Sequence, residues 1–358
     1  MSYLTHNRIV LTIIAFSLSC TSMFAQEGWT WTTVDSGVES RLRATRMGPD
    51  SFGVAVGDDS TVLKYDGKKW EPVGGEILTF GEDGDKAFPF SCPTGQGGLG
   101  TDARLDAVAL MDSQSFWIGG YGMGSDQRGM WLWNGTYWSP REAGPSNDRT
   151  LALWSDGFDI VLAGRGAPGR INRYDGKKWK IVLEGSIGFF RDIHGQLGST
   201  LWACGHVSLE KGGRTTFLNI VRSLDNGVTW EPDPQIQASP AGEMPWNAVY
   251  SLGDSLLWSA GNSGQILFWN GSTAEVIDAM SGPSSRKRHL NGVCALSSQK
   301  VWAIGDQGTI LFSNGESWTP VETSIENIGD LHEITSDGQG GLWIVGDAGL
   351  ILHGQPTP

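Results

Sequence analysis

The sequence predicts an all-β protein, a seven-bladed β-propeller with four antiparallel strands in each blade. Three observations lead to this fold. A short apolar run that ends in glycine recurs seven times, at intervals of 41 to 63 residues, near the ~40–50 residues of a propeller blade. An Asn-Gly or Asp-Gly pair follows most of these runs. The last repeat is one strand short, and the N-terminal region contains a strand that matches the missing one.

The composition agrees with this class. Among 358 residues there are 51 Gly and 17 Trp, and the formal net charge is −13. Frequent glycine disfavours long helices, and the tryptophans argue against a disordered chain, since disordered segments contain few aromatic residues. The excess of acidic residues also disfavours a nucleic-acid binder, which needs a basic face to displace counterions.

The N-terminus is predicted to be a secretory signal peptide over residues 1–25. Arg8 is followed by an apolar stretch over 9–18, and Ala25 stands before the expected cleavage point. This order of charge, short apolar core and small residue is typical of such signals. Residues 26–358 then form a single propeller domain, and we expect a secreted, periplasmic or cell-surface protein.

The cysteines raise one alternative for the N-terminus. Cys20 would carry a lipid anchor if the protein were a lipoprotein. No segment has the ~18 consecutive apolar residues of a membrane helix, so we expect no membrane span.

The remaining cysteines, Cys92, Cys204 and Cys294, are odd in number and cannot all pair within one chain. Cys204 and Cys294 lie in apolar runs and are expected to be buried.

The clearest repeat defines the strand order within a blade. A first strand, LNGVCAL, precedes the second strand, Val301-Trp-Ala-Ile-Gly305. The third strand and an Asn-Gly turn at 314–315 follow, and the fourth strand begins with Trp318. Asn-Gly and Asp-Gly favour the positive φ angles that a two-residue hairpin requires. The recurring glycines are Gly57, Gly120, Gly164, Gly205, Gly261, Gly305 and Gly346.

Most tryptophans fall at two recurring positions. One position is in the second strand of a blade and the other in the fourth, so we expect these side chains to pack neighbouring blades together rather than to form a ligand platform. The two sets are Trp117, Trp202, Trp258, Trp302 and Trp343, and Trp31, Trp70, Trp138, Trp179, Trp230 and Trp318. Trp246, in the loop before the fifth blade, fits neither set and is a candidate contact residue.

The seventh repeat stops after its third strand, in the run LILHG that ends at Gly354. The segment Trp29–Val34 carries the fourth-strand pattern, since Trp31-Thr-Thr-Val matches Trp318-Thr-Pro-Val. We therefore expect the N-terminal strand to complete the last blade, which closes the ring and removes an open sheet edge.

The segment Ser223–Trp230, SLDNGVTW, matches the S-x-D-x-G-x-T-W pattern of an Asp-box. With the wider GxxGxILxxxGxxW pattern, the chain resembles bacterial secreted propellers with BNR-like or YVTN-like repeats. It is more distantly similar to sialidase-type Asp-box propellers and to the photosystem II assembly-factor family. The resemblance implies the propeller fold and does not fix an activity. The F-R-I-P signature of sialidases is absent, and no Tyr is assigned to their nucleophile position.

Long or variable segments gather on one side of the predicted propeller. The loops between blades share a face with the loops between second and third strands. The long stretches there are 74–103, the largest insertion, and 121–129, 206–216, 231–245 and 277–289. Because function concentrates in variable loops on a rigid scaffold, we place the ligand site on this face.

The start of each first strand should line the central channel at this face. Aligning the seven repeats there gives only polar residues, Arg43, Asp106, Arg149, Arg191, Asn247, Asn291 and His332. Arginines suit carboxylate, sulfate or phosphate groups. A basic run before the sixth blade adds Arg286, Arg288 and His289 as candidate contacts. A solvated channel lining without a ligand is the alternative.

We therefore expect a non-catalytic binding or scaffold protein, a monomer that recognises a protein or an anionic glycan. The alternative is a glycoside hydrolase or lyase with Asp106 and Glu333 as acid and base, since such reactions use two carboxylates ~5–9 Å apart. No residue spacing indicates a metal site, and we expect no cofactor. Calcium at the acidic loop Glu82–Asp85 stays open as an alternative, although the residue order of a calcium loop is missing.

Overall fold

The computed structural model describes most of the chain. The described residues are 24–26, 28–48, 51–79, 86–90, 103–122, 129–140, 149–158, 160–166, 168–280, 288–322, 325 and 328–357. Residues 1–23, which include most of the expected signal peptide and Cys20, lie outside them. So do Cys92 and the acidic loop Glu82–Asp85.

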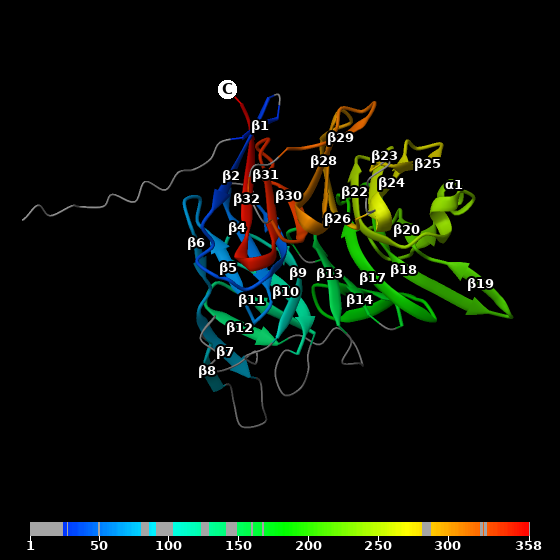
Figure 1. Ribbon diagram of the computed structural model, residues 1–358. Helices are drawn as coiled ribbons and strands as arrows, with labels where there is room; N and C mark the ends of the chain where they lie inside the picture. The colour runs from blue at the N-terminus through cyan, green and yellow to red at the C-terminus, as the bar shows by residue number, and fades with distance from the viewer. Residues whose placement is uncertain are drawn as a thin grey trace, which may run out of the picture.

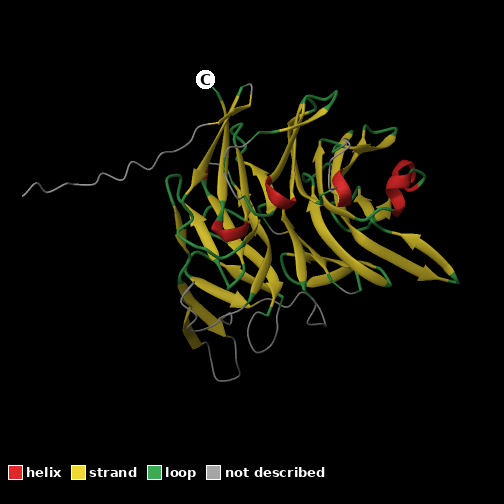
Figure 2. Ribbon diagram, viewed as in Figure 1, coloured by secondary structure: helices red, strands yellow, loops and turns green. Residues whose placement is uncertain are grey.

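The described strands form seven sheets that are arranged as blades around a central axis (Figures 1 and 2). This confirms the predicted seven-bladed β-propeller. Each innermost strand contacts the next around the ring, and the last contacts the first. The innermost strands of blades 1 to 7, in chain order, are β3 (Leu42–Met47), β9 (Arg104–Leu110), β13 (Thr150–Ser155), β17 (Ile187–His194), β22 (Trp246–Leu252), β26 (Leu290–Ser297) and β30 (Leu331–Ser336).

Three further antiparallel strands complete each blade. The second strands are β4 (Gly53–Gly57), β10 (Phe116–Tyr121), β14 (Ile160–Arg165), β18 (Leu201–Lys211), β23 (Leu256–Gly261), β27 (Lys300–Gly305) and β31 (Leu342–Gly346). The third strands are β5 (Val62–Tyr65), β11 (Met130–Trp133), β15 (Arg170–Asp175), β20 (Ile220–Ser223), β24 (Gln265–Trp269), β28 (Thr309–Ser313) and β32 (Ile351–Pro356). The outer strands are β6 (Trp70–Pro72), β12 (Tyr137–Pro140), β16 (Trp179–Glu184), β21 (Glu231–Pro232), β25 (Ala274–Asp278), β29 (Trp318–Pro320) and, in blade 7, β2 (Trp29–Val34).

Blade 7 is closed by the N-terminal strand, as predicted. β2 pairs antiparallel with β32, and Trp31 lies opposite Gly354. Trp318 lies opposite Ser313 at the matching place in blade 6, so the two outer strands have the same register. A Cβ at position 354 would lie 2.7 Å from the Trp31 ring, which explains why glycine faces this tryptophan. A further short strand, β1 (Phe24–Gln26), pairs with β2.

The recurring tryptophans pack one blade on the next. Trp179 of blade 3 meets Trp117 of blade 2 edge-on, with ring centroids 5.7 Å apart, a favourable aromatic geometry. Blade 5 lacks a tryptophan in its outer strand. Trp269 of its third strand packs on Trp202 of blade 4 instead, at 5.1 Å. The tryptophans at the two recurring positions are therefore part of the core, which is the role that the sequence predicts for them.

Several elements add to the basic blades. β7 (Gly75–Thr79) and β8 (Lys86–Phe90) belong to the predicted insertion, and β7 extends blade 2 by pairing parallel with β12. In blade 4, β19 (Arg214–Phe217) pairs with β18 alone. Between blades 4 and 5 lie a short helix, α1 (Pro234–Gln237), and a 3₁₀ turn, η2 (Pro240–Glu243). Among the helices in the described part of the chain, none is long and apolar enough to cross a membrane.

The turn Ser223–Trp230 is organised by Asp225. Its carboxylate accepts hydrogen bonds from the Thr229 amide at 2.8 Å and the Thr229 hydroxyl at 2.6 Å. The hydroxyl of Ser223 donates to the same carboxylate at 2.8 Å. The turn joins the third and outer strands of blade 4, so it lies on the face opposite the long loops.

Candidate ligand site at the channel mouth

Every innermost strand has a β-bulge at the same position near its start. In β3 the pairing with β4 shifts between Leu42 and Ala44, so that Arg43 is the extra residue. An extra residue at a bulge is unpaired, and its side chain is aimed in a new direction. The extra residues form a ring, and in chain order they are Arg43, Asp106, Leu151, Arg191, Asn247, Asn291 and His332.

This ring agrees with the predicted one in six blades and differs in the third. The repeat alignment placed Arg149 in the ring, whereas the bulge residue of β13 is Leu151. The expectation that all seven ring residues are polar is therefore wrong at blade 3. Arg149 precedes β13, and its side chain reaches the channel from there.

The bulges account for the recurring glycines. A Cβ at Gly57 would lie 2.0 Å from the carbonyl oxygen of Arg41, and a Cβ at Gly305 would lie 2.0 Å from that of His289. The innermost strand comes so close at its bulge that the second strand has no room for a side chain. Gly164 of blade 3 is an exception, because it pairs with Ala152 and its added Cβ would meet neighbours only at 3.1 Å or more. Elsewhere the recurring glycine reflects the close approach of the innermost strand.

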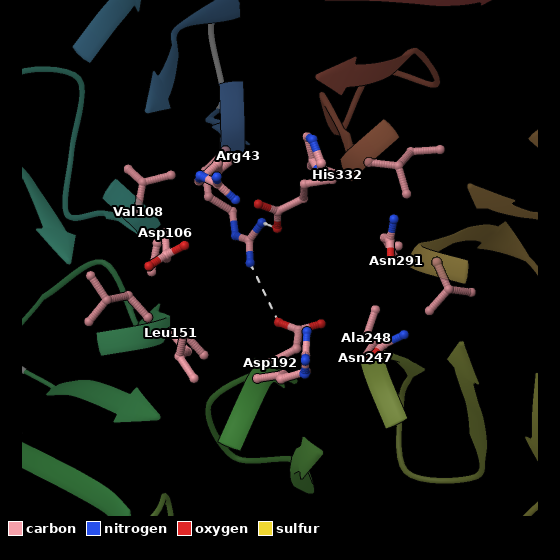
Figure 3. A pocket seen from close by; sticks show the side chains of 18 of the residues that line it. Arg43, Asp106, Val108, Leu151, Asp192, Asn247, Ala248, Asn291 and His332 are labelled. Carbon is pink, nitrogen blue, oxygen red and sulfur yellow. Dashed lines mark ion pairs between the residues drawn. The ribbon is translucent and has the colours of Figure 1, made fainter. Parts of the chain in front are cut away.

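The ring surrounds a cavity of about 310 Å³ at the centre of the propeller (Figure 3). A cavity of this size is near the lower end of the range for small-ligand sites. All seven predicted ring residues line it, Arg149 included. Among the described residues, five arginines and four carboxylates line the cavity. The lining is therefore rich in charge but close to neutral, and its unpaired groups matter more than its total charge.

In four blades the ring side chain is held by the residue after the recurring glycine. The Arg43 guanidinium donates two hydrogen bonds to Asp58, one of them at 2.9 Å. Asn291 donates to Asp306 at 3.0 Å. Asn247 and His332 make the equivalent contacts, with Asn262 and Asp347, and each pair is again 15 residues apart. A Gly-Asp or Gly-Asn pair at the end of the second strand is the sequence signal for this contact, and sequence analysis missed it.

These contacts also set the charge of the groups involved. Although partial burial opposes ionisation, the Arg43 guanidinium holds the pKa of Asp58 below its ordinary value. Burial lowers the pKa of His332, and the neighbouring Asp347 only partly offsets this effect. His332 is therefore neutral at pH 7, and one ring nitrogen lies 2.8 Å from Asp347.

Blades 2 to 4 bring three arginines to one side of the cavity, and two of them pair with the same carboxylate. Arg149 donates to both oxygens of Asp106, at 2.6 and 2.8 Å, and the Nε of Arg104 lies 2.7 Å from the same group. Arg191 has no carboxylate within salt-bridge distance in the part of the chain that the structure describes. Its guanidinium carbon lies 4.8 Å from the centroid of the Phe189 ring. Arg191 is exposed as a residue and lines the cavity, and burial of its guanidinium group lowers its pKa. Sequence analysis missed Arg104.

Arg46 crosses the channel and forms the floor of the cavity. Its guanidinium pairs with Glu333 of blade 7 and lies 3.8 Å from Asp192 of blade 4, the dashed contact in Figure 3. Both carboxylates are also held by backbone amides, Glu333 by Thr45 at 3.0 Å and Asp192 by Val249 at 2.9 Å. The ion pairs join three blades below the ring, and we call the cavity that the ring and Arg46 line the cup. Sequence analysis missed Arg46 and Asp192.

Neutral side chains lie along the channel beyond this floor. His194 stacks on Tyr250 with ring centroids 4.0 Å apart, and its Nδ1 accepts a hydrogen bond from the Ser251 amide at 3.1 Å. Burial lowers the pKa of His194 to about 3. Burial also raises the pKa of Asp192 above its ordinary value, although Arg46 opposes this. Charge at the floor is therefore costly and depends on Arg46.

The other predicted contact residues are placed differently. Trp246 is fully buried, and its indole N–H donates to the Ala241 carbonyl at 2.9 Å. The expectation that it contacts a ligand is wrong, because the ring is enclosed in the core between blades 4 and 5. Arg286 lies outside the described residues. Arg288 bonds within its own blade and His289 is exposed, and neither lines the cavity.

The two carboxylates of the enzymatic alternative are both paired with arginine. Asp106 forms ion pairs with Arg104 and Arg149, and Glu333 forms an ion pair with Arg46. Among the residues placed by the structure, no group of three or more His, Cys, Asp or Glu side chains could hold a metal ion. Cys204 and Cys294 are buried, as predicted, and both are free thiols.

These features define a seven-bladed propeller scaffold with a polar cup at the centre of one face. No protein-family model matches the chain, and no curated protein sequence matches it. Several solved structures are similar to it in fold. YCF48 bound to D1 peptide is similar with a TM-score of 0.62 and 17% identity, covering 94% of this chain and 100% of that one. YCF48 from Cyanidioschyzon merolae is similar with a TM-score of 0.61 and 17% identity, covering 91% of this chain and 98% of that one. The WD40 β-propeller domain of Doa1 is similar with a TM-score of 0.57 and 13% identity, covering 92% of this chain and 98% of that one. At these identities the likeness establishes the fold alone.

Proposed function

We propose that this chain is a secreted, non-catalytic binding scaffold that recognises a carboxylate-bearing segment of a partner protein at the mouth of the central cup. Arg191 is the observation that carries this proposal. It lines the cup and is exposed, and no described carboxylate pairs with it. A guanidinium in this state forms strong, charge-assisted hydrogen bonds with carboxylate, sulfate or phosphate.

The pairing of the other arginines narrows the site. Arg43 is held by Asp58 and Arg149 by Asp106. Removing Arg43 would leave Asp58 without its partner, and removing Arg149 would leave Asp106 with Arg104 alone. In a triple alanine variant of Arg43, Arg149 and Arg191, loss of contact with the ligand could therefore not be separated from loss of structure. Arg191 alone is the position to test.

Two further observations support a protein partner. The ring residues lie at the starts of the innermost strands, on the face that also carries the hairpin of β18 and β19 and the short helix α1, so a ligand at the cup lies beside surfaces that a protein could contact. A solved structure of similar fold carries a bound peptide. An anionic glycan satisfies the same arginine chemistry and is the second candidate, which the experiment includes.

The experiment compares the chain with its Arg191→Ala variant on a display library of random short peptides and on an array of carboxylated and sulfated glycans. Lys177→Ala is the matched control, because it removes one exposed positive charge in the turn after β15, away from the mouth. We expect selected ligands to bind Arg191→Ala at least about tenfold more weakly. Unchanged affinity, or selection of no ligand at all, would refute the proposed function.

A further inference from the structure

Blade 4 extends beyond the ring on the face of the cup. The start of β17, the second half of β18 and β19 form a small three-stranded sheet, in which Ile187 pairs with Ser208 and Ser208 with Phe217. The turn between β18 and β19 is Gly212-Gly213, and both residues have positive φ, as a two-residue hairpin requires. The hairpin projects from the body of the propeller (Figure 1).

The two faces of this sheet have different surroundings. Val207 points toward blade 3 and is fully buried. Its methyl groups fill the space beside Gly169 and Gly185, where an added Cβ would meet them at 2.6 and 2.5 Å. Side chains alternate between the two faces of a sheet, so the neighbours of Val207 along β18 point the other way. We call this second face the flap face, and its members are Ile187, Phe189, His206, Ser208 and Phe217.

The flap face carries three apolar side chains that stay partly or largely open to solvent, beside the polar His206 and Ser208. Ile187 exposes 66% of its surface. His206 is exposed, and Phe189 and Phe217 are half-buried. The rings of Phe189 and His206 meet edge-on, with centroids 6.3 Å apart. Neighbouring apolar side chains that stay exposed on a folded domain mark interaction surfaces.

Arg191 connects the flap face to the cup. It lies on β17 two residues after Phe189, stacks on that ring and lines the cavity. A cation–π contact orients a guanidinium without using up its N–H donors. The junction therefore presents an apolar surface beside a positive charge that no described carboxylate neutralises.

We propose that the flap face and Arg191 form one docking site for an extended peptide segment that carries an aromatic or aliphatic side chain close to a carboxylate. The apolar side chain covers Ile187 and Phe217, and the carboxylate pairs with Arg191 at the edge of the cup. This inference rests on the proposed function, because Arg191 belongs to both, and it adds the flap face as the part that selects the partner.

The probe is the same display library of random short peptides, selected on the full chain, with enriched peptides then synthesised and measured by fluorescence anisotropy. The test variant is Ile187→Ser with Phe217→Ser. Leu224→Ser is the control, since Leu224 is 67% exposed in a turn on the opposite face of the propeller. We expect enriched peptides to place an apolar residue near Asp or Glu. Their affinity should fall by about tenfold or more in the double variant and stay unchanged in Leu224→Ser.

The outcomes separate the two proposals. Weaker binding by Arg191→Ala together with unchanged binding by Ile187→Ser/Phe217→Ser overturns the docking role of the flap face and leaves the proposed function standing. Selection of no peptide overturns the peptide docking site, and selection of neither a peptide nor a glycan overturns the proposed function as well. A concentration-dependent dimer that the double variant abolishes would assign the face to a second copy of the chain. Binding to phosphatidylcholine–phosphatidylglycerol vesicles that the double variant abolishes would assign it to lipid. Either result overturns the peptide site. Thermal melting of each variant checks that the fold is intact.

Discussion

Replacing Arg46 with methionine tests whether the floor of the cup depends on this one cation. Methionine keeps much of the side-chain length and removes the charge, so Glu333 and Asp192 lose their shared partner. Breaking a buried ion pair by removing one member costs about 3–5 kcal/mol. The three side chains retain between 19% and 27% of their exposure, and water screens them in part. We therefore expect a loss of about 2–3 kcal/mol in the free energy of unfolding near pH 7.

The same variant should show a characteristic pH dependence. In the folded protein the pKa of Asp192 already lies above its ordinary value because of burial. Such a group contributes stability that is present below its unfolded pKa and lost as the pH rises through the folded pKa. Removing Arg46 raises the folded pKa further. The deficit of Arg46→Met relative to the unmodified protein should therefore be larger at about pH 7 than at about pH 4.5.

Urea unfolding followed by tryptophan fluorescence at these two pH values measures the deficit. Arg46→Met combined with Asp192→Asn and Glu333→Gln is the control, because it removes the orphaned charges along with the cation. This triple variant should recover most of the lost stability. An equal deficit at both pH values, or a triple variant as unstable as Arg46→Met, would refute the ion-pair account of the floor.

Two further predictions concern the ring and its repeats, beside the Arg191→Ala test above. Gly305→Ala places a Cβ 2.0 Å from the His289 carbonyl and should destabilise the fold by at least the ~1–3 kcal/mol of overpacking. Gly166→Ala, whose Cβ would meet neighbours at 3.6 Å or more, should be nearly neutral in the same urea titration; similar losses would contradict the close-approach argument. His332 has a lowered folded pKa, so its contribution to stability is present above the unfolded pKa and is lost as the pH falls. His332→Asn, which copies the ring residue of blades 5 and 6, should make the fall in melting temperature between about pH 6.5 and pH 5 shallower, although His194 and His353, whose pKa values are lowered in the same direction, keep part of it. An unchanged slope in calorimetry would show that His332 is not one of the groups responsible.

The site illustrates how far repeat alignment can reach. Arg43, Asn247 and His332 were found from the sequence because a repeat places equivalent residues at equivalent points of the ring. In blade 3 the repeat alignment gave the wrong ring residue, because the innermost strand begins with a different spacing and the apolar Leu151 occupies the bulge. Arg46 escaped because nothing in its own repeat marks it. Its partners Asp192 and Glu333 lie in blades 4 and 7, and only closure of the ring brings them to it.

The sequence by itself determined the fold of this protein. Glycine at the end of each second strand, Asn-Gly and Asp-Gly turns and recurring tryptophans act over a few residues or between neighbouring blades, so their physical effects can be read within a single repeat. The tertiary structure alone decided which charges remain available. Arg149 is neutralised by Asp106, which lies 43 residues away in sequence, whereas Arg191 stacks on an aromatic ring and pairs with no carboxylate among the residues that the structure describes. Ion pairing depends on distances across the closed ring, and no local pattern encodes those distances.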